Sequence, residues 1–354
     1  MQDPKSLMSR VLFLKYRTIM AKVKHIIFLQ SAHTATDERV LFHQANTLRQ
    51  HGYVVDICGM DNFNDFIPQI TDVYIVDTPR ALWKIRHTDA KIVYDITEWY
   101  PSKKNLRNLK IGKTIKALLM AVASIWAGWR ADAFIFGEKD KAKPFRFLFP
   151  KKKSIFLSYY PDLDYIKTNS LREIDSECRV LYAGPLTKEK GWERVVETMC
   201  GIAQKMPQMQ FKLDVISRNS IAEFVKPENL QVEVLQFMPF EKFCEQITKY
   251  DIFLDLRDID FENTRCLPIK LFYYMACGKP SIYSKLEAIK KGVPEFCECV
   301  QLVDNTSQAV DAMHKYITDK KFYQQHCVNA LKLSKDKYNW AIIKKDFLSL
   351  MNEL

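Results

Sequence analysis

The stretch CLPIKLFYYMACGKPSIYS at residues 266–284 combines a helix start, a helix stop and a strand in one short segment. Pro268 suits the first position of a helix, because its missing N–H would have no partner there. The apolar run 270–277 has the length of a short buried helix, and Gly278 ends it. Residues 281–283 then predict a buried strand. A helix that leads directly into a strand is typical of an α/β protein with a parallel sheet.

The same alternation extends over most of the chain. Before residue 160 we expect strands at 24–30, 54–58, 73–76, 91–94 and 133–136, with helices at 36–50, 80–86 and 109–129. After the polar stretch DLDYIKTNSLREIDSEC (162–178), further strands are expected at 179–183, 211–216, 232–235, 252–256 and 281–283. Strands that alternate with helices predict two doubly wound, Rossmann-like domains, at 1–165 and 166–330. We expect a C-terminal helix at 331–354 to pack back on the first domain, and a ligand in the cleft between the halves.

Composition narrows the class of protein. The chain has 354 residues, 47% of them hydrophobic and 27% charged, which is typical of a folded protein with two domains of ordinary size. Its nine cysteines are odd in number and scattered, which favours reduced thiols in the cytosol. Cys297 and Cys299 form a lone C-x-C, too few ligands for a zinc site, so we expect no metal. No apolar run reaches the roughly 20 residues that span a bilayer, and we expect no signal peptide.

The net charge of +11 is concentrated in one segment. Between residues 102 and 157 there are fourteen Lys or Arg and only three acids, so this segment accounts for the whole excess. Its basic residues alternate with Leu, Met, Trp and Phe, a pattern that suits an anionic membrane surface. A solvated basic face around one buried helix is the alternative. Nucleic acid is a further possible partner for such a patch, but it rests on charge alone, and we expect none.

Four stretches together resemble the retaining glycosyltransferases of the GT-B fold, in particular those of family 4. They are SAHTATDERVLFHQANTLRQHG (31–52), KIVYDITEWYP (91–101), YAGPLTKEKGWERVVE (182–197) and the opening stretch, which is similar to P-x-K-L-F-E-Y-M-A-x-G-K-P. The resemblance implies a nucleotide sugar as donor and no cofactor. It also implies donor contacts from Gly184, Lys190 and the helix start at Pro268, Ile269 and Lys270, where backbone amides and the helix dipole favour a diphosphate.

On the other half of the chain, Asp37, Arg39, Asp95 and Glu98 are expected near the acceptor side of the cleft. Glu98 and Asp95 are our candidates for catalytic contacts to the sugar or the acceptor. Each of the four residues has a structural alternative. For example, Asp37 would cap the helix that follows it, and Asp95 would close its turn.

Several positions depart from the family pattern. Its two glutamates fall on Arg265 and Tyr273, its arginine after the first donor strand falls on Pro185, and its histidine falls on Thr97. We expect Arg265 to replace the missing cation and Tyr273 to make one hydrogen bond to the ribose, unless Tyr273 only fills the core. The acids Asp255, Asp258, Asp260 and Glu262 are alternative ribose acceptors, or simply a solvated loop.

The resemblance implies transfer of a hexosyl group, with retention, to a glycan or a lipid-linked acceptor. Together with the basic segment 102–157, it predicts a cytoplasmic enzyme, peripheral on the inner membrane face, that builds a cell-surface polysaccharide. The competing hypothesis is a GT-B-fold protein that has lost transfer and serves as a binding or scaffold subunit.

Overall fold

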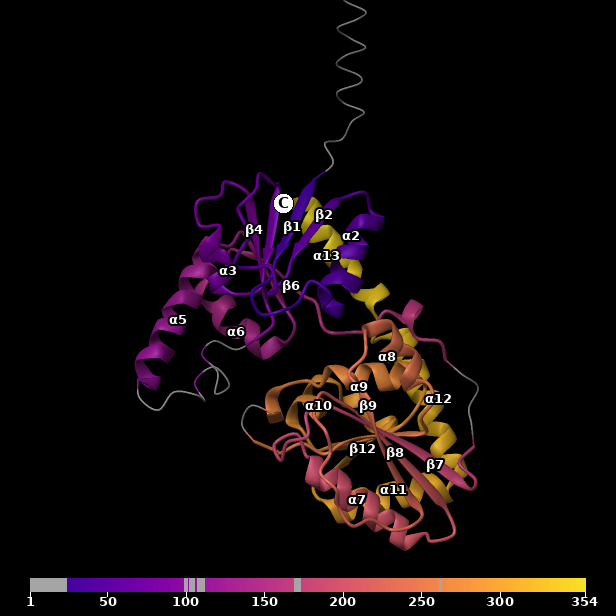
Figure 1. Ribbon diagram of the computed structural model, residues 1–354. Helices are drawn as coiled ribbons and strands as arrows, with labels where there is room; N and C mark the ends of the chain where they lie inside the picture. The colour runs from indigo at the N-terminus through magenta and orange to yellow at the C-terminus, as the bar shows by residue number, and fades with distance from the viewer. Residues whose placement is uncertain (1–23, 99–100, 102–105, 107–111, 169–172, 261–262) are drawn as a thin grey trace, which may run out of the picture. The chain divides into compact units, whose positions relative to one another are not determined.

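The computed structural model describes residues 24–98, 101, 106, 112–168, 173–260 and 263–354, and two parallel six-stranded sheets organise them (Figure 1). Unit 1 contains the described residues up to Ser158 together with Ile343–Leu354, and unit 2 contains Tyr159–Ile342. The two doubly wound α/β domains that the sequence predicts are therefore confirmed.

Unit 1 has the strand order β2-β1-β3-β4-β5-β6. The strands are β1 (His25–Leu29), β2 (Val54–Cys58), β3 (Val73–Val76), β4 (Lys91–Ile96), β5 (Ala133–Phe136) and β6 (Lys153–Phe156). Its helices are η1 (Glu38–Ala45), α2 (Asn46–Gln50), α3 (Pro79–Lys84), α5 (Lys113–Arg130) and α6 (Lys139–Leu148). Strands β3 and β5 are buried at every residue, as expected of parallel strands that helices cover on both faces.

Unit 2 has the strand order β12-β11-β10-β7-β8-β9. The strands are β7 (Glu177–Ala183), β8 (Gln210–Ser217), β9 (Leu230–Gln236), β10 (Ile252–Asp255), β11 (Ser281–Ser284) and β12 (Val300–Val303). Its helices are η2 (Leu163–Tyr165), α7 (Trp192–Lys205), α8 (Phe240–Ile247), η3 (Asn263–Arg265), α9 (Ile269–Ala276), α10 (Glu287–Gly292), η4 (Pro294–Glu298), α11 (Thr306–Thr318) and α12 (Lys320–Asp336).

The pleat of the unit 2 sheet separates two of the clusters that form its core. Val180 and Tyr182 of β7 pack with residues of α7 and α11, whereas Leu181 and Ala183 pack with residues of α8 and α9. Successive side chains of a strand point to opposite faces, so the same short strand contributes to both layers. This arrangement holds the carboxyl ends of the central strands in fixed positions.

The C-terminal helix α13 (Trp340–Glu353) contributes its last part to unit 1 (Figure 1). Phe347 and Met351 are fully buried. Three contacts within unit 1 fix the end of the helix: Lys24 Nζ donates to the carbonyl of Met351 at 3.0 Å, Tyr53 donates to Asn352 at 2.5 Å, and Lys153 pairs with Glu353 at 2.6 Å.

Candidate functional site

The strand order of unit 2 defines a crevice between β7 and β10. Beyond these neighbouring strands the chain connections run in opposite directions, which is the point at which open α/β sheets bind their ligands. The loop from Gly184 to Gly191 follows β7 and packs against the end of β10. Gly191 has φ +79°, and a Cβ atom there would lie 2.0 Å from the carbonyl oxygen of Leu256, so this close approach requires a glycine.

Two of the lysines that the sequence singled out lie at this crevice. Lys190 Nζ donates to Asn263 Oδ1 at 3.1 Å and pairs with Glu189 at 3.0 Å. Lys270 extends its Nζ over Gly184, since a Cβ atom on that glycine would lie 3.2 Å from it. The structure thus brings Gly184, Lys190 and Lys270 together, and it adds Asn263, which sequence reasoning missed.

Next to Lys270 lies a buried ion pair between Asp255 and Arg257. Both oxygens of Asp255 accept from Arg257, at 2.9 and 2.6 Å, and Asp255 also accepts from the hydroxyl of Tyr283. Arg257 donates to the same hydroxyl at 2.9 Å. Burial opposes ionisation of Asp255, but Arg257 outweighs it, and the pKa of Asp255 is lowered. Lys270 Nζ lies 4.0 Å from this carboxylate.

The environment of Lys270 lowers its pKa to about 8. Burial is the main cause, and the charges of Arg257 and Lys190 act in the same direction, whereas Asp255 acts against them. The Lys270 side chain is 30% exposed, so an anion can reach it. An anion between Lys190 and Lys270 would be bound by two cations whose mutual repulsion it relieves.

The start of α9 differs slightly from the expectation. Pro268 precedes the helix as its N-cap, in an extended conformation, and Ile269 is the first helical residue. The N–H of Leu271 donates to the carbonyl of Pro268 at 3.3 Å. The N–H groups of Ile269 and Lys270 therefore lie in the first turn, where an α-helix supplies no acceptor of its own.

The structure places Tyr273 in the core of unit 2 and Arg265 on its surface. Tyr273 is 1% exposed, and its ring packs edge-on against Phe240 and Phe243 of α8, at 5.8 and 6.3 Å between centroids. This placement favours the core role over a contact to the ribose. Arg265 is exposed at the end of η3, and Asn263 of the same short helix is the residue that reaches Lys190.

The loop acids have partners within the protein. Arg257 occupies both oxygens of Asp255, Arg194 pairs with Asp258 at 2.7 Å, and Asp260 accepts from the N–H of Asn263 at 2.7 Å. Their contacts favour a structural role over that of a ribose acceptor. Glu262 lies outside the described residues.

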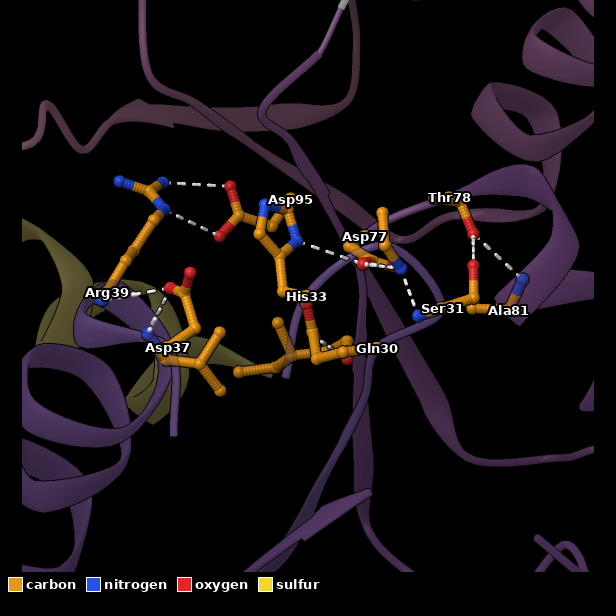
Figure 2. A network of polar contacts seen from close by, with 12 residues as sticks. Gln30, Ser31, His33, Asp37, Arg39, Asp77, Thr78, Ala81 and Asp95 are labelled. Atoms are coloured by element: carbon orange, nitrogen blue, oxygen red, sulfur yellow. Dashed lines mark hydrogen bonds and ion pairs between the residues drawn. The ribbon is translucent and has the colours of Figure 1, made fainter. Parts of the chain in front are cut away.

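In unit 1 the corresponding crevice lies between β1 and β3. Asp77, just beyond β3, is 2% exposed and accepts from the N–H groups of Ser31 and Ala32, at 2.9 and 2.8 Å (Figure 2). Its Oδ2 also lies 3.0 Å from His33 Nδ1. Burial opposes the charged form of His33, but the hydrogen bond to Asp77 and the charges of Asp37 and Asp95 outweigh burial, so the pKa of His33 is raised. Neither His33 nor Asp77 follows a chain signal that would single it out in the sequence.

Asp95 lies in β4 and is only 3% exposed. Arg39 donates to both of its oxygens, at 3.1 and 2.8 Å (Figure 2). Gln44 donates to one of them at 2.8 Å. Arg39 also donates to the carbonyl of Leu157. These contacts favour a structural role for Asp95 over a catalytic one.

The other acidic candidates of unit 1 are Asp37, at the start of η1, and Glu98, beyond β4. Asp37 caps η1, because its side chain accepts from the N–H groups of Arg39 and Val40, at 3.0 and 3.4 Å. Glu98 is half-buried, two residues beyond β4. Glu38 begins η1, and burial, together with the charge of Asp37, raises its pKa to about 8. η1 is a π-helix, a form that often occurs at functional sites.

Two Rossmann-like units, each with a polar crevice at its switch point, and C-terminal helices define the GT-B fold, as the sequence motifs predicted. No protein-family model and no curated protein matches the sequence. Among solved structures, sucrose-phosphate synthase from Thermosynechococcus elongatus superposes with a TM-score of 0.63 at 13% identity, over 93% of this chain and 98% of that one.

Two further solved structures are similar. Anabaena HepE in complex with UDP-glucose has a TM-score of 0.60 at 14% identity, over 94% of this chain and 100% of that one. An alpha-glucosyltransferase in complex with UDP-glucose and DNA containing an abasic site has a TM-score of 0.56 at 12% identity, over 93% and 99%. At such identities the likeness establishes the fold.

Proposed function

We propose that the protein is a glycosyltransferase that transfers a hexosyl group, with retention, from a nucleoside diphosphate sugar to a hydroxyl of a glycan or lipid-linked acceptor. The observation that carries the proposal is the pair of lysines, Lys190 and Lys270, at the switch point of unit 2 beside the first turn of α9. The complexes of HepE with UDP-glucose and of the alpha-glucosyltransferase with UDP-glucose support a nucleotide sugar as donor.

The site would stabilise the departing nucleoside diphosphate. Lys190 and Lys270 supply two positive charges, and the N–H groups of Ile269 and Lys270 supply donors at the positive end of a helix dipole. Charge that develops on the diphosphate during transfer is then met by groups that are already in place. Arg257 contributes indirectly, because its pairing with Asp255 leaves that carboxylate less able to neutralise Lys270.

Nucleotide binding tests this proposal directly. We expect UDP, GDP or CDP at about 100 times its dissociation constant to raise the free energy of unfolding by about 2.7 kcal/mol. Lys190→Ala and Lys270→Ala should weaken this binding at least tenfold each, because each removes a full charge from the phosphate site. Lys205→Ala is the matched control, since Lys205 pairs with Asp311 on the surface of the same unit. Unchanged binding by the Lys190 and Lys270 variants would place the nucleotide elsewhere.

A role in cell-surface polysaccharide synthesis, on the inner face of a membrane, is also part of the proposal. It rests on the basic segment 102–157, of which Lys103, Lys104, Arg107 and Lys110 lie outside the described residues. Fractionation of cells in low and high salt tests it: a protein found in the cytosol under both conditions contradicts peripheral attachment.

A binding or scaffold subunit with the GT-B fold is the second candidate. Three departures favour it: the proline at position 185 in place of the family arginine, the buried Tyr273 and the threonine at position 97. Each changes a position that the family uses for the donor. Thermal unfolding in the presence of UDP, GDP or CDP separates the two candidates. Stabilisation by a nucleotide, followed by release of that nucleotide from its sugar when acceptor is added, supports the enzyme, and no stabilisation by any nucleotide supports the scaffold.

A further inference from the structure

Helix α5 turns its large apolar side chains toward solvent. Six of them are exposed by between 48% (Ile125) and 68% (Ile115); the other four are Leu118, Leu119, Val122 and Trp129. The buried residues of the helix are small: Ser124, Ala127 and Gly128. A surface helix of a globular protein normally has the reverse arrangement, with large apolar residues facing the core.

The exposed residues form a single stripe along the helix. Positions 115, 118, 119, 122, 125 and 129 follow one another at intervals of one, three or four residues, so their side chains share one side of α5. Trp83 of α3, which is 57% exposed, adds to the apolar surface near this helix, because its ring lies 5.2 Å from that of Trp126. Contiguous apolar surface of this kind marks an interaction site.

The C-terminal end of α5 is firmly packed. Gly128 lies against Phe149, so closely that a Cβ atom would be 2.4 Å from the ring. Lys152 closes the C-terminal end of α5, where its Nζ donates to the carbonyl of Gly128 at 2.8 Å and to those of Trp129 and Ala131. The C-terminal part of α5 is therefore packed against unit 1, whereas no residue of 113–123 is buried, and the outer face of the helix is left for a partner.

The charges around the stripe have one sign. Residues 113–130 contain Lys113, Lys116 and Arg130 and no acid, and residues 112–157 contain ten Lys or Arg against three acids. The guanidinium of Arg86 lies 4.9 Å above the ring of Trp83, which places another cation beside the apolar surface. Protein interfaces are depleted in lysine, whereas an anionic bilayer accepts lysines at the edge of an apolar stripe, where their heads reach the phosphates.

We propose that α5 lies in the surface plane of an anionic bilayer, with the stripe against the acyl chains and Lys116 and Arg130 among the lipid phosphates. An in-plane helix needs a large apolar face and a basic border, and α5 has both. No helix in the described ranges is long and apolar enough to cross a membrane. The inference rests on the proposed membrane attachment and is independent of sugar transfer.

Vesicle sedimentation tests the inference without donor or acceptor. The wild-type protein is expected to sediment with vesicles of equal parts phosphatidylcholine and phosphatidylglycerol, and at least tenfold less with phosphatidylcholine alone. The double variant Leu118→Ser with Leu119→Ser should reduce binding to the anionic vesicles at least tenfold. Both side chains are more than 60% exposed, so the fold should tolerate the change, and an unchanged melting temperature checks this.

The matched control is Ile67→Ser with Ile70→Ser, which removes two apolar residues of unit 1 that are 76% and 100% exposed but far from α5 in sequence. It should bind like the wild type. Trp129 provides a second readout: brominated lipid should quench its fluorescence, and Trp129→Phe should remove most of that quenching.

The outcomes separate the inference from the wider proposal. If vesicles bind the α5 double variant as well as the wild type, the α5 assignment is wrong and membrane attachment survives through another surface. If the wild type does not bind anionic vesicles, both are wrong. If instead the wild type dimerises and the double variant does not, the stripe is an interface between copies of the chain, which also overturns the inference.

Discussion

The buried pair of Arg39 and Asp95 allows a sharp test of whether Asp95 is structural or catalytic. The change Asp95→Asn keeps the shape of the side chain but removes the charge that two guanidinium hydrogen bonds, at 3.1 and 2.8 Å, now meet. Arg39 is 2% exposed, so its charge would stay buried without a counter-ion. Removing one partner of such a pair typically costs about 3–5 kcal/mol.

A loss of this size would be plain in an unfolding experiment. Domains are usually stable by about 5–15 kcal/mol, so unit 1 would lose a large part of its stability. We expect urea unfolding, followed by circular dichroism at pH 7, to show a clearly earlier transition for the variant. Asp37→Asn is the matched control, because asparagine caps a helix about as well as aspartate and the change should cost at most a few tenths of a kcal/mol.

A double-mutant cycle adds a second check. Combining Asp95→Asn with Arg39→Gln removes the unpaired charge, so the double variant should be more stable than the sum of the two single losses predicts. The structural reasoning is refuted if Asp95→Asn unfolds at the wild-type urea concentration and yet abolishes transfer, which is the behaviour of a catalytic carboxylate.

Three further outcomes follow from the site and its surroundings. Because the pKa of Lys270 is lowered to about 8, affinity for UDP should fall as the pH rises through 8, and Lys270→Arg should make titrations between pH 7 and 9 flat. Gly191→Ala should lower the free energy of unfolding by more than the about 1–2 kcal/mol of a left-handed alanine, because its Cβ would meet the Leu256 carbonyl, and it should also weaken nucleotide binding. The control is Gly52→Ala, at φ +83° with open space around it, which should lose only the about 1–2 kcal/mol of the left-handed conformation. The pKa of Glu38 is raised to about 8, so the folded state holds its proton more tightly and stability should fall as the pH rises from 4.5 to 8; Glu38→Gln should remove that slope from urea midpoints, and an unchanged slope would contradict it.

Much of the fold could be predicted because parallel strands buried on both faces form short apolar runs between helices. The two runs at 73–76 and 133–136 coincide with β3 and β5. Strands β6 and β12 escaped prediction because KSIF and VQLV are short and interrupted by polar residues. η1 was expected as an ordinary helix, since apolar spacing does not distinguish an i→i+5 from an i→i+4 hydrogen-bond pattern.

The site was predictable only where a residue follows a recognisable chain signal. Lys190 precedes a glycine at a strand-to-helix turn, and Lys270 lies at a helix start after a proline, so the sequence located both. Arg257 and Tyr283 are 26 residues apart and meet only because β10 and β11 are neighbours in the sheet. Asp255 looked like a free loop acid because sequence does not show that Arg257, two residues later, folds back onto it.

The departures from the family pattern are connected within unit 2. With proline at position 185, the loop after β7 lacks the arginine of the family pattern, and the Nζ of Lys270 lies over Gly184. A carboxylate at position 273 would be buried against the rings of Phe240 and Phe243, where its charge would have a large desolvation cost, whereas a tyrosine fits that apolar contact. Under the proposed function, the diphosphate would be bound by Lys190 of this loop together with Lys270 and the first turn of α9. Under the proposed function, Asn263 is a candidate contact to the rest of the nucleotide: it is 5% exposed, its Oδ1 accepts from Lys190, and its Nδ2 has no hydrogen-bond partner within the described part of the chain. Buried donors rarely stay without a partner, so a ligand acceptor beside Lys190 would complete this site.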